Sequence, residues 1–449
     1  MDKHKKDWVY AQSALESKQI DSFRMSFLHM HPYDQAQFFQ AQDRDMRMAI
    51  YTYLSPDEMA EIMENIELEA TERYFTEMDP RFSSFILAKM PADDAVDILN
   101  KMEKDKVASF LTLMDEKAAA EIKGLLHYEE KTAGSIMTTE FVSVYKTQTV
   151  QQVLQQLKEE APVAETIYYL YVLDEDKRLV GVVSLRDLII VDADSTIADV
   201  MNENIVKVSV AKDQKDVVQT IQDYDLLALP VVDFQHHLLG IVTVDDILDV
   251  MDEEASDDYS KLAAVSDLQR PDDSPAIAAK KRLPWLIILL FLGMLTASLI
   301  DQFEQTLSQV PLLAIFIPLI AGMAGNTGTQ SLAVAVRGLA TGGFGKQGKM
   351  KLMLRETTTG LITGTVCGIV VVGIIFFWKG ELYMGMLVGG SLLVTLTVAT
   401  LSGSIIPLIM DRLKIDPAVA SGPFITTIND ITSTMIYFGF ATVFLGFLL

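Results

Sequence analysis

One ionisable residue, Asp430, lies deep inside an apolar run near the end of the 449-residue chain. No Lys, Arg or His in the apolar runs lies at a comparable depth to pair with it. A charge at the centre of a bilayer costs at least about 2.5 kcal/mol, so such residues are usually functional. Oxygen donors precede it, at Thr426, Thr427 and Asn429. Hard oxygen ligands of this kind indicate a cation site.

A second polar stretch, Gly325-Asn-Thr-Gly-Thr-Gln-Ser331, lies in another apolar run. Its two glycines permit close approach of helices, and Asn326 and Gln330 offer oxygen acceptors. Two interpretations stay open for these two side chains. They line a cation path, or they form hydrogen bonds that hold helices together.

A single carboxylate is a weak site for a divalent ion, which favours a pair of chains. Two copies of Asp430 across a two-fold axis would supply two negative charges, and two-fold homodimers are the commonest oligomers. Mg²⁺ fits better than Ca²⁺, because Mg²⁺ keeps several of its waters and needs only one or two carboxylates. Glu304 and Glu356 are secondary candidates, although Arg355 beside Glu356 favours a structural ion pair there.

Five apolar runs are long enough to form helices that carry these residues, since about 20 residues cross the hydrocarbon core. Basic residues cluster before the first run, between the second and third, and between the fourth and fifth. By the positive-inside rule we expect a protein of the cytoplasmic membrane, with the long N-terminal part in the cytoplasm and the C-terminus outside. The runs cover residues 283–300, 310–335, 357–378, 382–410 and 418–449.

The part of the chain before these runs is strongly acidic. Residues 1–282 hold 29 basic and 54 acidic side chains, whereas residues 283–449 hold 8 and 7, and the whole chain has a net charge of −24. This excess excludes nucleic-acid binding as the main function, because phosphate recognition needs clusters of Lys and Arg. It indicates a cationic partner. The single cysteine, Cys367, excludes a disulfide framework and a thiolate zinc site.

A twelve-residue period runs from Pro32 through eight units. Apolar residues recur six positions after the start of each unit. Sequences such as Ser55-Pro-Asp-Glu58 combine an N-cap, a proline at the first helical position and acids in the first turn. Each unit is therefore predicted to be a short helix and a turn, and the stack a small α-solenoid. The units start at positions 32, 44, 56, 68, 80, 92, 104 and 116.

A second duplication follows at Gly134. The segment 171–187 recurs as 230–246, and each copy predicts strand, helix, strand, turn, strand and helix. The two copies resemble a pair of CBS modules, which implies adenine-nucleotide binding through Ser/Thr-x-x-Asp elements. The alternative, that these residues only cap the helices that they precede, is equally open. The elements are Ser184 with Asp187 and Thr243 with Asp246.

The second copy leads into fourteen residues, 245–258, that hold eight acids and no base. On a helix, acids four residues apart would form one stripe of like charge. A solvated face is the usual explanation of such a run. The alternative is a cation sensor, because these acids and those near position 93 should repel unless cations bridge them. The predicted sensor residues are Asp93, Asp94, Asp245, Asp246, Asp249, Asp252, Glu253, Glu254, Asp257 and Asp258.

The order of these parts resembles the MgtE family of magnesium channels over nearly the whole chain. The motifs that carry the resemblance are the polar stretch 325–331, Asn429-Asp-Ile-Thr432, Ala164-Glu-Thr-Ile-Tyr-Tyr169 and Asp416-Pro-Ala418. The resemblance implies a homodimer with the pore between protomers and a hydrated Mg²⁺ held at Asp430. It also implies Mg²⁺ bound between cytoplasmic domains, which closes the pore through a connecting helix. Gly422 stands where some relatives have a side-chain oxygen.

We therefore predict a multi-domain protein with a cytoplasmic α-helical superhelical repeat domain, a tandem CBS (α/β) pair, a connecting helix and a five-helix transmembrane domain. It is expected to import Mg²⁺, to be closed by cytoplasmic Mg²⁺ and to be modulated by ATP at the CBS pair. The predicted boundaries are 1–130 for the repeat domain, 131–200 and 201–256 for the CBS modules, 257–282 for the connecting helix and 283–449 for the membrane domain.

Other classes of protein fit the sequence less well. A CBS-regulated secondary transporter of another divalent cation or a small solute is the main alternative, although five unlike spans lack the internal repeats of such transporters. An enzyme is not expected. The stretch 343–349 matches most of a phosphate loop, but Met350 replaces the Ser or Thr that would bind Mg²⁺ and no strand precedes it.

Overall fold

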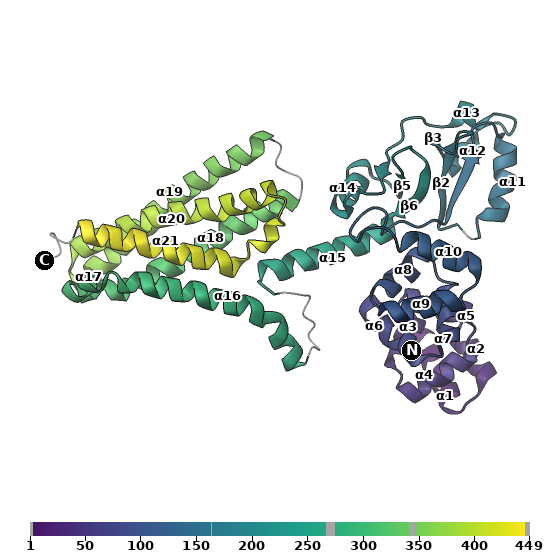
Figure 1. Cartoon of the computed structure of the whole chain (residues 1–449), viewed down its shortest axis with the longest axis horizontal. Coiled ribbons are helices and arrows are strands. Elements are labelled where there is room, and N and C mark those ends of the chain that lie inside the picture. The colour runs from purple at the N-terminus through teal and green to yellow at the C-terminus, as the bar shows by residue number, and fades with distance from the viewer. Residues whose placement is uncertain (1–2, 163, 266–273, 341–345, 445–449) are drawn as a thin grey trace. The chain divides into compact units, whose positions relative to one another are not determined.

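The computed structural model describes residues 3–162, 164–265, 274–340 and 346–444, and Figure 1 shows the order of their helices and strands. The chain divides into two compact units, Met1–Met251 and Asp252–Leu449. The first unit contains the short repeat helices and the described strands. The second contains the long apolar helices.

Ten short helices open the described part of the first unit, and their spacing confirms the twelve-residue period. Every predicted unit begins a helix at its first residue, from Pro32 to Glu116. Local caps explain these starts: Ser55 forms a capping box with Glu58. The helices are α1 (Lys3–Glu16), α2 (Ile20–Phe27), α3 (Pro32–Ala41), α4 (Arg44–Tyr53), α5 (Pro56–Glu64), α6 (Leu68–Glu77), α7 (Pro80–Leu87), α8 (Ala92–Asn100), α9 (Lys104–Leu113) and α10 (Glu116–Leu125).

Alternate repeat helices pack on one another, which builds the predicted solenoid from two rows of helices. Helix α5 contacts α3 and α7, α7 contacts α9, and α8 contacts α6 and α10. The apolar residues six positions after each start are all buried in one core. They are Phe38, Ile50, Ile62, Tyr74, Ile86, Ile98, Phe110 and Ile122.

Two three-stranded sheets follow, one in each copy of the duplication. In each sheet the first strand is parallel to the second, and the second is antiparallel to the third. Both copies therefore have the predicted order of elements, and a shared cluster around Tyr171 and Ile241 joins them. The elements are β1 (Phe141–Tyr145), α11 (Val150–Glu160), β2 (Thr166–Leu173), β3 (Leu179–Ser184), α12 (Leu185–Ile190), α13 (Ile197–Val200), β4 (Val208–Ser209), α14 (Gln214–Tyr224), β5 (Ala228–Val232) and β6 (Leu238–Thr243).

The acidic run lies on one helix, α15 (Val244–Leu262). This helix ends where Ala264 adopts a left-handed φ of 57°. A new helix, α16 (Pro275–Asp301), begins after Ser274, which caps it. The prediction of a single connecting helix over 257–282 is therefore wrong. The two ends of that range belong to different helices, and positions 266–273 lie outside the described residues.

The second unit contains the predicted membrane helices. Four segments are long and apolar enough to cross a membrane: Pro275–Asp301, Pro311–Leu339, Gly348–Lys379 and Leu382–Arg412. The fifth run also forms a helix, α21 (Gly422–Val443), but its described residues are not among these spans. Thr, Asn and Asp side chains interrupt its apolar sequence. The fifth span therefore stays a prediction.

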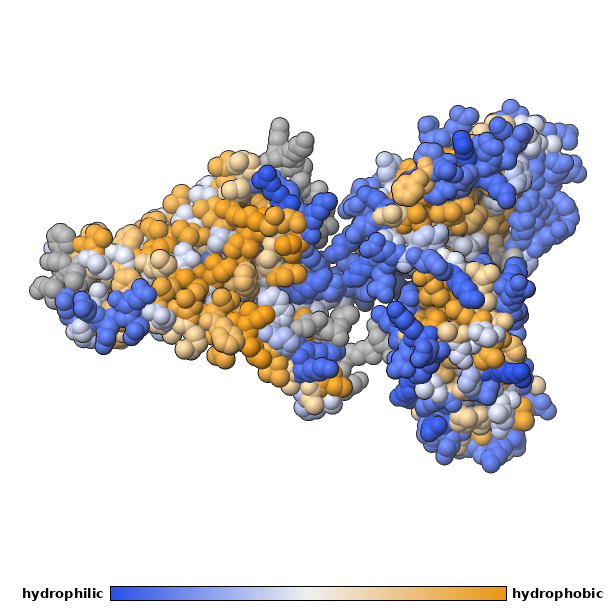
Figure 2. All heavy atoms as spheres, viewed as in Figure 1, coloured by the Kyte–Doolittle hydropathy of each residue, from blue (hydrophilic) through white to orange (hydrophobic). Residues whose placement is uncertain are grey.

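Helix α20 is central to this unit, because it contacts α18, α19 and α21. Helix α16 contacts α21 but has no buried residue, and apolar side chains cover much of the visible surface of these helices (Figure 2). Lipid or another membrane chain would cover such a surface. The remaining elements are α17 (Glu304–Gln309), η1 (Pro311–Phe316), α18 (Ile317–Ala340), α19 (Lys346–Lys379), α20 (Leu382–Arg412) and η2 (Pro417–Val419).

Candidate functional site

Asp430 lies in α21 with its side chain partly exposed. Within the described part of the chain, its carboxylate has no hydrogen-bond or ion-pair partner, and only its backbone carbonyl accepts a bond, from the Ser433 hydroxyl. A carboxylate among apolar helices without a counter-ion is costly unless a cation joins it. The Asp430 carboxylate is therefore open to a ligand.

The polar stretch 325–331 forms the middle of α18 and packs tightly against α21. A Cβ on Gly328 would stand 1.9 Å from Nδ2 of Asn429, and a Cβ on Gly325 would stand 2.7 Å from Cγ2 of Thr426. Larger residues do not fit at such distances, so these glycines set the separation of the two helices. The predicted close approach of helices at these glycines is therefore confirmed.

Asn429 serves packing within the single chain, and its role as an ion ligand stays a prediction. Its side chain is buried, Nδ2 donates to the carbonyl of Ala324 at 3.4 Å, and Oδ1 accepts from Oγ of Ser402 at 2.5 Å. Neighbouring residues on a helix point about 100° apart. This rotation turns Asn429 into the bundle and leaves Asp430 accessible.

Asn326 and Gln330 lie on a different face of α18. Both side chains are exposed, and neither has a hydrogen-bond partner among the described residues. They are four residues apart and therefore on one face of the helix. The adjacent Ser331 is buried inside the bundle. Helix α18 thus presents a polar face outward from the single chain.

The other predicted pore residues lie at different depths. Thr426 and Thr427 donate their hydroxyl hydrogens to backbone carbonyls one turn earlier in α21, and their oxygens can still bind a cation. Glu304 is the exposed first residue of α17, and the preceding phenylalanine stacks on Phe438. Phe438 is about 12 Å along α21 from Asp430. Glu304 therefore belongs to the end of the bundle and not to the Asp430 site.

A second candidate site is a cluster of carboxylates in the first unit. Asp93 and Asp94 lie in the first turn of α8, and Asp246 lies in the first turn of α15. Three further acids belong to the cluster, and the sequence did not single these out as sensor residues: Glu165 acts electrostatically on Asp93, Glu64 acts on Asp94, and Glu140 acts on Glu64. They are Glu64 at the end of α5, Glu140 before β1 and Glu165 before β2.

Burial and mutual repulsion hold protons on this cluster. Burial and the charge of Asp246 raise the pKa of Asp93 to about 7. Burial, Asp93 and Glu64 raise the pKa of Asp94 to about 8. Desolvation by surrounding protein atoms and the charges of Glu61, Glu165 and Glu140 raise the pKa of Glu64 to about 7. The Glu64 side chain nevertheless reaches solvent. Oδ1 of Asp93 is buried and has no hydrogen-bond partner among the residues that the structure describes.

A cluster of oxygen ligands with excess negative charge suits a hard cation such as Mg²⁺. In the described ranges, no three Asp, Glu, His or Cys side chains are grouped closely enough to enclose an ion. Mg²⁺ usually keeps several waters and binds through one or two carboxylates. The spacing of these acids therefore suits a hydrated ion better than a bare one.

The acidic stripe lies along α15, as predicted. Half of its eight acidic side chains are exposed, which agrees with the solvated interpretation and leaves them accessible to cations. Asp245, Asp249, Asp252 and Glu253 are exposed, Asp246, Asp257 and Asp258 are partly buried, and Glu254 is buried.

Lys261 lies at the C-terminal end of this stripe and joins it to the membrane helices. Its Nζ lies 2.8 Å from Oδ2 of Asp257 and 2.5 Å from Oδ2 of Asp416, in the turn before α21. Leu262 packs against the cluster that contains Ile425 of α21. Sequence reasoning missed this contact, because Lys261 and Asp416 are 155 residues apart. The end of α15 is thereby attached to α21.

The Ser/Thr-x-x-Asp elements have the geometry of helix caps. Oγ of Ser184 lies 2.6 Å from Oδ2 of Asp187 and accepts the N–H of the same residue. The Thr243 hydroxyl donates to Oδ2 of Asp246. The capping interpretation is therefore correct for Ser184. It leaves the second carboxylate oxygen of Asp187 available to a nucleotide.

Family models match three parts of the chain. A divalent cation transporter model matches residues 317–440, the MgtE intracellular N domain matches 30–131, and CBS domains match 133–194 and 197–253. The chain is similar to the magnesium transporters MgtE of Enterococcus faecalis, Bacillus subtilis and Thermus thermophilus, with 51%, 39% and 37% identity. These alignments cover 96–97% of this chain and 96–98% of the relatives.

Solved structures match the first unit. The soluble part of a magnesium transporter is 49% identical with a TM-score of 0.55, and the match covers 56% of this chain and 100% of that one. The cytosolic domain of the Mg²⁺ channel MgtE in complex with ATP is 38% identical with a TM-score of 0.52, covering 54% and 99%. The inosine-5'-monophosphate dehydrogenase of Nitrosopumilus maritimus matches only 26% of this chain, a likeness of the CBS pair alone.

Proposed function

Since the chain belongs to the MgtE family of magnesium transporters, we propose that it imports Mg²⁺ through a pore between two copies of itself. As a family member it is a transporter and not an enzyme. Cytoplasmic Mg²⁺ bound to the acidic cluster closes the pore, and ATP at the CBS pair modulates it. The N-terminal domains lie in the cytoplasm, and the multi-pass membrane domain ends outside.

The main support for the proposed pore is that the Asp430 carboxylate has no partner among the described residues. It lies in a bundle whose helix α18 also turns Asn326 and Gln330 outward. Lipid offers these groups neither hydrogen bonds nor counter-charge. A second copy related by a two-fold axis would cover this polar face and contribute a second Asp430. The two carboxylates then hold Mg²⁺ through its waters.

The raised pKa values of Asp93, Asp94 and Asp246 support the sensor. Without a cation these carboxylates repel one another, and Mg²⁺ replaces that repulsion by attraction. One site contributes about 1.4 kcal/mol when the Mg²⁺ concentration is ten times its Kd. Four such sites together approach the roughly 5.5 kcal/mol that moves a two-state equilibrium from 1:99 to 99:1.

The attachment of Lys261 supports transmission from sensor to pore. Helix α15 carries Asp246 at its start and Lys261 near its end, and Lys261 contacts Asp416 just before α21. A change in the position of α15 therefore acts on the helix that carries Asp430. High internal Mg²⁺ favours the closed state, and depletion favours the open one. This direction suits homeostasis, because influx stops when the cell is replete.

The CBS pair supports a regulatory nucleotide. Asp187 lies at the start of α12 with one carboxylate oxygen bonded to Ser184. A relative's cytosolic domain, 38% identical to this chain, was solved in complex with ATP. Asp187 and Asp246 would accept hydrogen bonds from ribose hydroxyls. The homodimer, the gating and the nucleotide are three separable parts of the proposal.

Mg²⁺ uptake into liposomes that contain the full chain tests the pore. Asp430→Ala should abolish uptake while the dimer, measured by mass in detergent, stays intact. Glu381→Gln is the matched control, since Glu381 is an exposed acid at the start of α20 and its loss should not change uptake. Normal uptake by an intact Asp430→Ala dimer would rule out this pore. Uptake that depends on a counter-ion gradient would instead favour a secondary transporter.

A further inference from the structure

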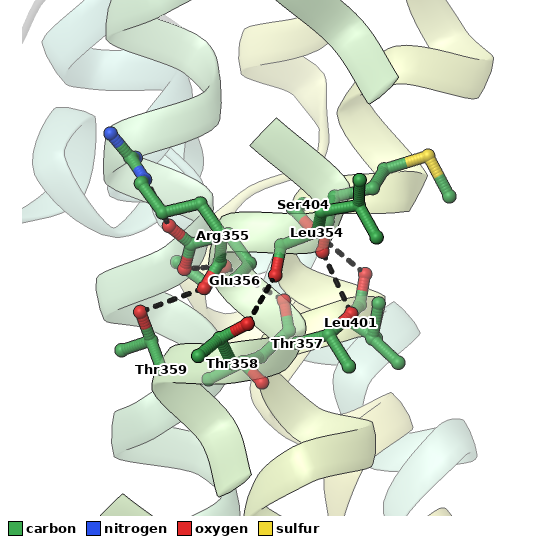
Figure 3. A network of polar contacts seen from close by, with 11 residues as sticks. Leu354, Arg355, Glu356, Thr357, Thr358, Thr359, Leu401 and Ser404 are labelled. Atoms are coloured by element: carbon green, nitrogen blue, oxygen red, sulfur yellow. Dashed lines mark hydrogen bonds and ion pairs between the residues drawn. The ribbon is translucent and has the colours of Figure 1, made fainter. Parts of the chain in front are cut away.

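Glu356 is a buried carboxylate that the proposed ion path does not use. It lies in α19 with 6% of its surface exposed. Figure 3 shows it beside Arg355, whose Nη2 lies 3.0 Å from Oε1 of Glu356. The hydroxyls of Thr358 and Thr359 donate to carbonyls of their own helix and not to Glu356. The second carboxylate oxygen, Oε2, is therefore available to another helix.

That oxygen accepts a hydrogen bond from Ser331 of α18, at 2.9 Å from Oγ. Ser331 is the last residue of the polar stretch 325–331 and is 2% exposed. Its Oγ also lies 2.7 Å from the carbonyl oxygen of Thr400 in α20. The single hydroxyl hydrogen of Ser331 is shared between these two acceptors, so one side chain connects three helices.

The helices at this junction are in direct backbone contact. A Cβ on Gly403 of α20 would stand 2.2 Å from the carbonyl oxygen of Gly328 and 3.0 Å from Cβ of Ser331. Helix α18 cannot approach α20 any closer. Its rotation about its own axis is set by the close packing of Gly325 and Gly328 against α21 and by the side-chain contacts of Ser331, of which Glu356 makes one.

This rotation decides where the polar face of α18 points. Successive helical residues differ by about 100°, which places Gln330 about 100° and Asn326 about 140° from Ser331. We propose that Glu356 is a positioning residue for transport. It holds Ser331 inward and thereby keeps Asn326 and Gln330 directed at the ion path. This inference rests on the proposed pore and assigns Glu356 to ion selection, not to ion binding.

Uptake measured over a range of Mg²⁺ concentrations, and in competition with Ca²⁺, tests this role in the full chain. Glu356→Ala removes the acceptor and should raise the apparent KM for Mg²⁺ about tenfold and weaken discrimination against Ca²⁺, because Asn326 and Gln330 would no longer be held toward the ion path. Ser331→Ala should have the same effect, and the double variant should be no worse than either single one. Glu356→Gln keeps an oxygen acceptor for Ser331 and should restore both properties.

Ser404→Ala is the matched control. Ser404 is fully buried in α20, but its hydroxyl donates to Leu401 of its own helix (Figure 3), so transport should not change. Unchanged KM and Ca²⁺ discrimination in Glu356→Ala would overturn the role, whatever happens to the melting temperature. So would a Glu356→Gln variant as defective as Glu356→Ala.

Two further variants keep the test decisive. If Glu356→Ala does not fold, Ser331→Ala removes the same hydrogen bond and decides the question by the same two measurements. Asp430→Ala, assayed in parallel, separates the two proposals. If Asp430→Ala loses uptake while Glu356→Ala is unaffected, only the role of Glu356 is overturned. If Asp430→Ala retains uptake, the proposed pore is overturned.

Discussion

Replacing Asp93 by asparagine should stabilise the Mg²⁺-free cytoplasmic part of the chain at neutral pH. Burial and the charge of Asp246 raise the pKa of Asp93 from 3.8 to about 7. The folded chain therefore keeps this proton over a pH range in which the unfolded chain has lost it. By linkage, the free energy of unfolding falls as pH rises from about 4 to about 7, and stays low above that range.

The difference between 3.8 and about 7 sets the size of the effect. Each pH unit corresponds to 1.36 kcal/mol, which gives an upper bound of about 4 kcal/mol at pH 7.5. The Asp93 side chain is partly exposed, and solvent reduces the penalty, so about 2 kcal/mol is expected. For a fragment of this size, that corresponds to roughly 4–8 °C in melting temperature.

Thermal unfolding of a fragment of residues 1–262 measures this effect, since the soluble part of a related magnesium transporter crystallised by itself. In EDTA, the wild-type fragment should lose stability as pH rises from about 5 to about 7.5, and Mg²⁺ should restore it. Asp93→Asn should melt roughly 4–8 °C above wild type at the upper pH and gain less from Mg²⁺.

Asp105→Asn is the matched control. Asp105 occupies the second position of α9, as Asp93 does in α8 one repeat earlier, but it is exposed. Both substitutions remove a negative charge from the first turn of a helix, which costs about 0.3–1 kcal/mol of favourable interaction with the helix dipole. This cost is common to both variants and cancels when their melting temperatures are compared. The carboxylate cluster would not be a sensor of this kind if Asp93→Asn melted at or below Asp105→Asn and kept the full response to Mg²⁺.

Three further substitutions address other parts of the molecule. Lys261→Asp should abolish closure by cytoplasmic Mg²⁺ in current recordings, because it breaks the contact with Asp416. Adding Asp416→Lys should restore closure. If it did not, this contact would have no role in closure. Gly328→Ala should destabilise the membrane domain by about 1–3 kcal/mol or more, because its Cβ would stand 1.9 Å from a side chain of α21. Gly322→Ala, which meets nothing within 4 Å, should melt like wild type in detergent. Asp187→Ala should weaken ATP binding at least about tenfold by calorimetry without altering the Mg²⁺ response; unchanged ATP affinity would leave Asp187 as a cap only.

The repeat helices could be predicted because their signals are local. Ser55 and Glu58 illustrate this, since a cap and an acid three residues later define a helix start without tertiary information. The CBS strands were predictable because two copies within one chain support each other. The prediction of a single connecting helix was wrong, although the sequence itself contained a signal for a helix boundary. Ser274 and Pro275 mark a helix start inside the predicted range, and their capping signal decides the structure.

The candidate sites were less predictable because they depend on helix rotation and on convergence of distant segments. Asn429 neighbours Asp430 in the sequence, but a rotation of about 100° per residue turns it into the bundle. Glu64 and Glu165 join the carboxylate cluster from separate elements. With 61 Asp and Glu residues in the chain, composition alone does not indicate which ones converge.

Current through the full-length protein in a planar bilayer, recorded while Mg²⁺ on the cytoplasmic face is raised from micromolar to millimolar, tests gating by the transported ion. We expect a Mg²⁺-selective current that closes as cytoplasmic Mg²⁺ rises, and a chain lacking residues 1–262 that conducts without closing. If the truncated chain were closed by the same Mg²⁺ concentrations, the sensor would lie in the membrane domain, and the acidic stripe of α15 would be only a solvated surface.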